Sequence, residues 1–179
     1  MKIQWLGNDA FILSGKDTAV HFNPADGKPA GTFTVLSTPG NRTDQSGEKM
    51  FDLPGEFEVG GILAQGFYSD SGDNIVYKVV MEETGIVYFG NLKETPKSDF
   101  FDALGENTDI VMVNLSKDFD NKAAKDLITK ITPRMAILGG DATYFPALVE
   151  SLNAKTVENN PHTIKGLSDD NTEVIILPL

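Results

Sequence analysis

The stretch Phe51-Asp52-Leu53-Pro54-Gly55-Glu56-Phe57-Glu58-Val59-Gly60-Gly61 decides how this chain is expected to fold. Its centre, residues 55–59, alternates acidic and apolar side chains, which is the period-two pattern of a strand with one buried face. Turn-forming proline and glycine residues stand on both sides of it. A further apolar run over residues 62–67 follows at once, so the two segments are expected to form an antiparallel hairpin.

Strand-like runs extend from this hairpin in both directions. Short apolar or alternating segments separated by Gly, Asp, Asn and Pro cover residues 2–6, 10–14, 18–22, 33–37, 74–81 and 85–89. Residues 39–48 are rich in small and polar side chains and are expected to form a loop. Because short turns join most of these runs, an antiparallel arrangement is expected throughout the first half of the chain.

The second half of the chain alternates strands and helices. The pattern predicts helices over residues 98–104, 121–131 and 144–152, and buried strands over residues 110–115 and 135–138. Such alternation predicts parallel strand packing. Two final runs, residues 163–167 and 173–177, are expected to pair as a hairpin around residues 168–171. A mixed α/β (α+β) fold follows, with two sheets packed face to face and helices outside, in a single domain over residues 1–179.

Composition excludes several classes of partner. The chain carries 15 Lys and Arg against 26 Asp and Glu, a formal net charge of −11, and its basic residues are scattered. Nucleic acids and anionic membrane surfaces require basic patches, so neither is expected as a partner. No apolar run is long enough to span a membrane, and the first residues lack a secretory signal, so a cytoplasmic location is expected.

Histidine and cysteine content limits the chemistry. The chain has no cysteine and two histidines, His21 in an apolar strand and His162 after a turn. A catalytic zinc site usually takes two or three histidines. Serine hydrolysis needs a base within hydrogen-bond reach of the nucleophile, and histidine is the usual base. Neither chemistry is expected from these residues, and both histidines are expected to be structural.

Four segments together resemble a known family: residues 3–11, 35–44, 51–61 and 87–92. In this order they are similar to the metallo-β-lactamase-fold hydrolases, and specifically to the small branch that includes the ascorbate-phosphate lactonases. The tract Leu53 to Gly61, with its Pro-Gly-Glu-Phe-Glu-Val core, is the most specific part. The resemblance covers nearly the whole chain and implies a minimal, single-domain version of the four-layer αββα sandwich.

The resemblance also implies where metal ligands should stand. Members of the family bind one or two metal ions, typically zinc, through a His-x-His-x-Asp-His loop and later His, Asp and His ligands. The residues that stand at or near the ligand positions of this sequence, and form the expected remnant of the site, are Asn8, Thr38, Gly40, Arg42, Thr43, Ser71, Asn91 and Gly140. An early aspartate of the family is replaced by Asn23. No metal and no other cofactor is therefore expected.

Two hypotheses about function follow from these replacements. The first is a catalytically inactive member of the family, a pseudoenzyme retained as a binding or structural module that forms homo-oligomers or contacts a protein partner. The alternative is a divergent hydrolase for a phosphoester or lactone, working without metal or with a metal held by oxygen ligands. Magnesium or calcium needs only oxygen donors. Such a site would use Asp44, Asp70 and Asp141 together with Asp9 and Asn91.

Overall fold

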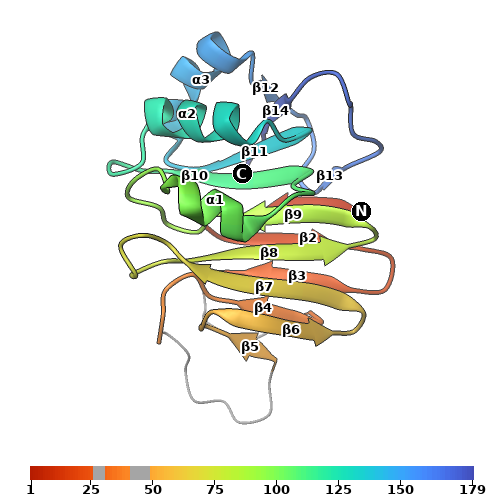
Figure 1. Cartoon of the computed structure of the whole chain (residues 1–179). Coiled ribbons are helices and arrows are strands. Elements are labelled where there is room, and N and C mark those ends of the chain that lie inside the picture. The colour runs from red at the N-terminus through yellow and green to blue at the C-terminus, as the bar shows by residue number, and fades with distance from the viewer. Residues whose placement is uncertain (26–30, 41–48) are drawn as a thin grey trace.

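The computed structural model describes residues 1–25, 31–40 and 49–179, and two β-sheets with three α-helices make up this part of the chain (Figure 1). The elements are β1 (Lys2–Trp5), β2 (Phe11–Ser14), β3 (Ala19–Phe22), β4 (Phe33–Val35), β5 (Met50–Phe51), β6 (Gly55–Val59), β7 (Ile62–Tyr68), β8 (Ile75–Met81), β9 (Thr84–Tyr88), α1 (Ser98–Leu104), β10 (Ile110–Leu115), α2 (Asn121–Ile131), β11 (Met135–Gly140), the 3-10 turn η1 (Ala142–Tyr144), α3 (Phe145–Leu152), β12 (Lys155–Thr156), β13 (His162–Thr163) and β14 (Glu173–Ile176).

The strands form a six-stranded sheet in the order β13-β1-β2-β3-β4-β5 and an eight-stranded sheet in the order β12-β14-β11-β10-β9-β8-β7-β6. The expected hairpin of β6 and β7 is present, and antiparallel pairing continues through β8 and β9. The expectation of an antiparallel first half is wrong at one place, because β3, β4 and β5 pair in parallel. Parallel neighbours cannot be joined by a tight turn, so these strands lie farther apart in the sequence than the strands of the hairpins.

The space between the two sheets holds one apolar core. Alternate residues of each strand point into it, for example Phe11 and Leu13 from β2 and Tyr77 and Val79 from β8, all fully buried. This alternation is what the period of a strand requires when only one face is covered. Phe22 and Tyr88 meet across the core with ring centroids 4.8 Å apart, so the two sheets contact each other directly.

A second apolar core lies between the eight-stranded sheet and the helices, with α1 in front of that sheet in Figure 1. Phe100 of α1, Leu127 of α2 and Leu148 of α3 all pack into it. Helix α2 begins where the Asp120 side chain accepts hydrogen bonds from two backbone N–H groups, and it ends ahead of Pro133. The mixed α/β class with two stacked sheets is confirmed. In the described ranges the helices cover the eight-stranded sheet, and none is long and apolar enough to cross a membrane.

The C-terminal segment corrects one expectation. The two tail strands do not form a hairpin: β13 pairs antiparallel with β1 in one sheet, and β14 pairs parallel with β11 in the other. The last three residues of β14 are buried. Asn160 joins the two sheets, because its amide accepts from Trp5 N at 3.0 Å and donates to Trp5 O at 2.7 Å and Pro178 O at 2.8 Å.

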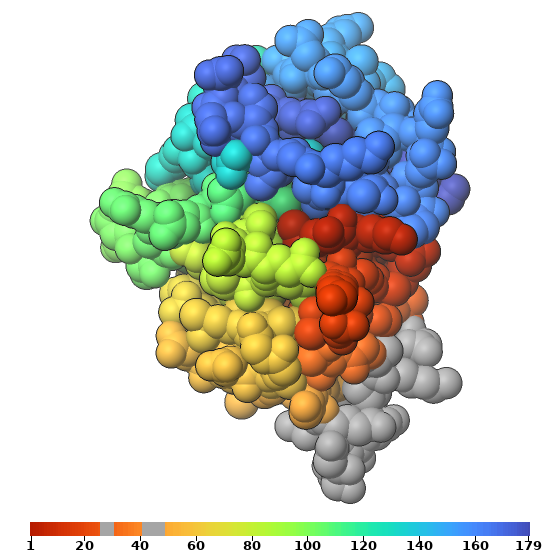
Figure 2. All heavy atoms as spheres, turned by 90° about the vertical axis from the view of Figure 1, so that its right-hand side faces the viewer, coloured from red at the N-terminus to blue at the C-terminus, as the bar shows by residue number. Residues whose placement is uncertain are grey.

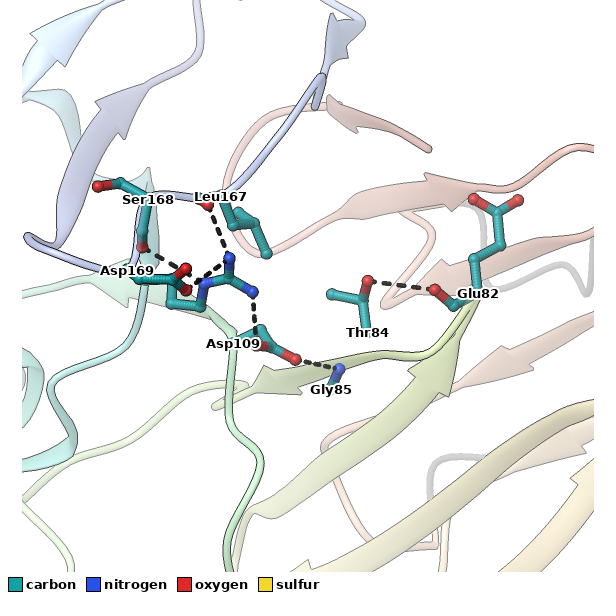
Figure 3. A network of polar contacts seen from close by, with 8 residues as sticks. Glu82, Thr84, Gly85, Asp109, Leu167, Ser168 and Asp169 are labelled. Carbon is teal, nitrogen blue, oxygen red and sulfur yellow. Dashed lines mark hydrogen bonds and ion pairs between the residues drawn. The ribbon is translucent and has the colours of Figure 1, made fainter.

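Hydrogen bonds and ion pairs link the chain segments at the amino ends of the parallel strands (Figure 3). Arg134, just before β11, donates to Leu167 O at 2.7 Å and pairs with Asp109 and Asp169, and Asp109 accepts from Gly85 N at 2.9 Å. At this end the β8–β9 turn lies beside the β2–β3 turn (Figure 2), where Glu82 accepts from the backbone of Lys16. Ligands of such sheets bind at the carboxyl ends of the strands, which lie at the opposite end of the sheet from this network.

Candidate functional site

A cleft of about 780 Å³ lies at the carboxyl ends of the parallel strands. One wall is the β1–β2 loop with Asn8 and Asp9, and the other is formed by residues that follow β9, β10 and β11. Its polar lining includes Asn91, Asn114 and Asp141. Apolar side chains from Trp5, Leu6, Leu115, Ala142 and Leu179 share the lining. The cleft therefore combines separate polar and apolar surfaces, as small-molecule sites do.

The β1–β2 loop is held in place by its backbone. Gly7 and Asn8 both have positive φ, 97° and 48°, conformations that glycine and asparagine tolerate best. The Asn8 carbonyl accepts from Trp5 Nε1 at 2.8 Å and from Gly140 N at 2.9 Å, so the loop is bonded to its own strand and to the eight-stranded sheet. These contacts set the position of Asp9, the next residue.

Asp9 is bound by two side-chain amides. Its Oδ2 accepts from Asn23 Nδ2 at 2.7 Å and from Asn91 Nδ2 at 2.5 Å. Asn23 has a φ of 44° and lies at the carboxyl end of β3. Its Nδ2 also lies 2.7 Å from Ser37 Oγ and 2.8 Å from Tyr88 Oη, and its Oδ1 accepts from Ser37 N at 2.7 Å. Asn23 is therefore the centre of a network that joins both sheets.

Tyr88 and Asn74 complete this network from the eight-stranded sheet. The fully buried Tyr88 hydroxyl donates to Asp9 O at 2.7 Å. Burial, and secondarily the nearby Asp9 charge, hold the pKa of Tyr88 well above its usual value, so the hydroxyl stays neutral and remains a donor. Asn74 Oδ1 accepts from Asn91 N at 2.8 Å and positions that residue. A Cβ at Gly90, which has a φ of 62°, would lie 2.4 Å from Asn74 Oδ1, so only glycine fits between them.

Asn114 is among the residues that line the cleft. It occupies an inward-facing position of β10, two residues beyond the buried Met112, and is 6% exposed. Its Nδ2 donates to Gly90 O at 2.9 Å, whereas its Oδ1 is buried and has no hydrogen-bond partner among the described residues. A buried acceptor without a partner costs about 1–3 kcal/mol in folding free energy.

The structure brings together part of the expected remnant of the family site. Asn8, Asn91 and Gly140 line the same cleft. Thr38 and Gly40 are exposed beyond β4, close in sequence to Ser37 of the network. Ser71 lies in the β7–β8 turn, where its hydroxyl donates to Asp73. Arg42 and Thr43 lie outside the described residues.

Two aspartates of the expected oxygen-only cation site lie in different connections, Asp70 between β7 and β8 and Asp141 directly after β11. Asp70 Oδ2 accepts from Lys97 N at 2.8 Å, and Asp141 Oδ1 accepts from Thr143 N at 2.9 Å at the start of η1. That hydrogen bond from Thr143 lowers the pKa of Asp141. Asp44 lies outside the described residues, so the oxygen-only cation site stays a prediction.

The residues that the structure describes do not fit the zinc centre that the fold implies. Zinc is bound by histidine, cysteine or carboxylate ligands. In residues 1–25, 31–40 and 49–179, no three such side chains are grouped where they could hold a metal ion. At the carboxyl ends of the strands, Asp9 is the carboxylate of the network, and amide N–H groups point at its Oδ2.

Four residues of the network and the cleft lie outside the set of site residues expected from the sequence: Ser37, Asn74, Tyr88 and Asn114. Three of them are buried polar side chains at or next to the ends of strands, and Tyr88 is the last residue of β9. The signal for Asn114 was present, because it is the polar residue in the otherwise apolar strand Ile-Val-Met-Val-Asn-Leu. A polar residue in such a strand indicates a hydrogen-bond partner or a site.

Comparison with known proteins identifies the family. The family model described as the beta-lactamase superfamily domain matches residues 2–138. A solved structure of a metallo-beta-lactamase superfamily protein from Thermotoga maritima is similar with a TM-score of 0.77 and 19% identity, covering 99% of each chain. The metallo-beta-lactamase fold protein YhfI from Bacillus subtilis has a TM-score of 0.62 and 8% identity, covering 99% of this chain and 96% of its own.

The isothiocyanate hydrolase from Delia radicum gut bacteria has a TM-score of 0.63 and 10% identity, covering 100% of this chain and 96% of its own. At these identities the three structures show a shared fold and nothing about activity. The comparison with curated proteins gives no match. The resemblance drawn from the sequence is confirmed, and the chain belongs to the beta-lactamase superfamily.

Proposed function

We propose that this protein is a catalytically inactive member of its family and binds a ligand in the cleft. One observation carries the proposal: the Asp9 carboxylate receives side-chain amide donors from Asn23 and Asn91, one from each sheet. In this arrangement the carboxylate is an acceptor within a protein network. The same side chains are then available to hold the walls of a binding site in place.

The donor chemistry argues against metal-assisted hydrolysis. In that reaction the metal lowers the pKa of a bound water to about 7, which requires several ligands with free lone pairs directed at the ion. Here Asn23 and Asn91 direct N–H groups at Asp9 Oδ2. Turning these amides would break the bonds that Asn23 makes to Ser37 and Tyr88. No catalytic step is assigned to a metal.

The same network gives no support to metal-free hydrolysis. Ser37 is the hydroxyl at its centre, and it is fully buried. Its Oγ accepts from the Asn23 amide, which is not a base. A serine nucleophile requires a base that removes its proton. Ser37 is therefore a structural member of the network.

Metal analysis and an activity panel test this proposal. Protein purified without chelator is expected to hold no stoichiometric zinc, iron or manganese, and to hydrolyse no phosphoester, lactone or thioester above background with Mg²⁺, Mn²⁺ or Ca²⁺. The panel is run on the wild type, on Asp9→Asn, and on Asp102→Asn as a matched change of an exposed carboxylate on α1. Turnover that Asp9→Asn abolishes and Asp102→Asn retains would overturn the proposal, as would a stoichiometric metal lost in Asp9→Asn alone.

A further inference from the structure

We propose that strand β6 is a docking edge for an extended segment that carries basic side chains at alternate positions. This edge lies outside the cleft, so the inference is independent of the proposed binding function. Three features carry it: the length of this edge strand, the backbone groups that it directs outward, and the two glutamates on its exposed face.

The first feature is the length of β6 compared with the other edge strands. A sheet edge presents backbone groups without partners, and proteins often limit this by keeping edge strands very short. The edge strands β5, β12 and β13 have two residues each, whereas β6 has five and, in the described part of the chain, pairs with β7 alone (Figure 1). The ring of Phe57 stacks on Phe51 with centroids 3.6 Å apart, which fixes β6 against the opposite sheet. Among these four edge strands, β6 therefore offers the longest edge to a further strand.

The second feature is the direction of the backbone groups of β6. The β6–β7 turn has two glycines with φ of 60° and 76°, so Val59 and Ile62 on either side of it form a hydrogen-bonded pair. Hydrogen-bonded and free pairs alternate along antiparallel strands. The backbone N–H and C=O groups of Glu56 and Glu58 therefore point away from β7, and among the described residues no backbone group pairs with them. An added strand would satisfy these donors and acceptors.

The third feature is the charge that this edge presents. The side chains of Glu56 and Glu58 lie on one face of β6, and both are exposed. Glu56 Oε2 accepts from Gln65 Nε2 at 2.7 Å, and within the described residues neither glutamate forms an ion pair. Opposite charges directly across two paired strands stabilise the pairing, and like charges destabilise it. The edge therefore favours lysine or arginine at every second position of the added strand.

The same two glutamates argue against a second copy of this chain as the occupant. A two-fold symmetric dimer would pair the β6 strands antiparallel, with their outward-directed backbone groups facing each other. When this pairing is centred on Phe57, it places Glu56 opposite Glu58 at two places. A shift by two residues still leaves one glutamate opposite its own copy. Because like charges directly opposite destabilise a strand pair, a basic segment is favoured over a second copy.

A charge-swapped copy of this protein is the probe. The double variant Glu56→Lys, Glu58→Lys presents an extended strand with basic side chains at the required spacing. It is titrated without label into isotope-labelled wild type at low ionic strength, and the amide resonances of residues 55–59 are followed by NMR. The matched control is the double variant Glu150→Lys, Glu158→Lys, which changes the net charge equally at two other exposed positions.

The charge-swapped variant is expected to shift the resonances of residues 55–59 in a saturable manner, and to bind at least about tenfold more tightly than the control variant. Higher ionic strength should weaken this binding, because salt screens exposed charges. The absence of saturable shifts at residues 55–59, or equal binding by the control variant, would overturn the proposal.

A neutral variant gives a second, independent measurement. The double variant Glu56→Gln, Glu58→Gln keeps the side-chain size and removes the repulsion between two copies, so it should associate with itself through residues 55–59 more tightly than wild type does. Spectra recorded over a range of protein concentrations compare the two proteins. Equal self-association of wild type and the neutral variant at this edge would refute the selection by charge.

Discussion

Replacing Asn23 by aspartate tests the amide network directly. The Asn23 Nδ2 donates to Asp9 Oδ2 at 2.7 Å, so Asn23→Asp would place a second carboxylate against the first. Two ionised carboxylates at this distance repel strongly, and one of them takes up a proton instead, so its pKa rises. Asn23 already has a φ of 44°, which aspartate also tolerates, so the change of backbone preference is small.

The expected loss in the free energy of unfolding equals the cost of keeping one of the two carboxyl groups protonated. Keeping a carboxyl group of ordinary pKa, about 4, protonated at pH 7 costs at most about 4 kcal/mol, at about 1.4 kcal/mol per pH unit. Both side chains are partly exposed, which reduces the expected loss in the free energy of unfolding to about 2–4 kcal/mol. At pH 4 the loss should fall below about 1 kcal/mol, because a protonated carboxyl again donates a hydrogen bond to Asp9. The folded state binds more protons than the unfolded state in this window, so the stability of the variant decreases as pH rises from 4 to 7.

Urea denaturation at pH 4 and pH 7 measures both values. Trp5 is the only tryptophan, is buried, and donates to the Asn8 carbonyl, so its fluorescence reports on the site. The control is Asn153→Asp, at an exposed position with a φ of 52° at the end of α3, where the cost should stay near 0.5 kcal/mol. Equal losses for Asn23→Asp and Asn153→Asp at pH 7 would refute the network described here.

Two further predictions concern packing and alkaline stability. Gly139→Ala should destabilise the fold by about 1–3 kcal/mol, because the new Cβ would lie 2.5 Å from Phe11 Cζ in the core. The control Gly166→Ala places a Cβ that meets nothing within 4 Å and should change stability by less than about 1 kcal/mol. Thermal unfolding compares the two variants, and equal melting temperatures would contradict the close packing at Gly139. Burial raises the pKa of Tyr88 in the folded state, so above about pH 10 the unfolded chain releases the hydroxyl proton while the folded state keeps it, and the free energy of unfolding falls. Tyr88→Phe removes this proton and should make stability less sensitive to pH above about 10. Parallel slopes of unfolding free energy between pH 9 and 11 for wild type and variant would speak against that account.

Much of the architecture was predictable because it depends on local periodicity. The hairpin of β6 and β7 follows from alternation between turn residues, and α1 and α2 have the expected bounds. The tail could not be predicted in the same way. The sequence predicts strands near His162 and Glu173, but it does not say which strands they pair with. In the structure β13 pairs with β1 in one sheet, and β14 pairs with β11 in the other. Pairing partners depend on contacts between distant segments, which local patterns do not contain.

The sequence by itself determined which ligand types are scarce: with two histidines and no cysteine, the chain lacks the ligands of a histidine-rich zinc centre wherever its residues lie. It also determined the family, through segments that stay recognisable in order along the chain. Only the tertiary structure decided what stands at the carboxyl ends of the strands, where Asp9 meets Asn23 and Asn91 and where the buried Asn114 is among the residues that line the cleft. Side-chain identity is a property of each residue, whereas a hydrogen bond between residues 9 and 91 exists only once two sheets have packed against each other.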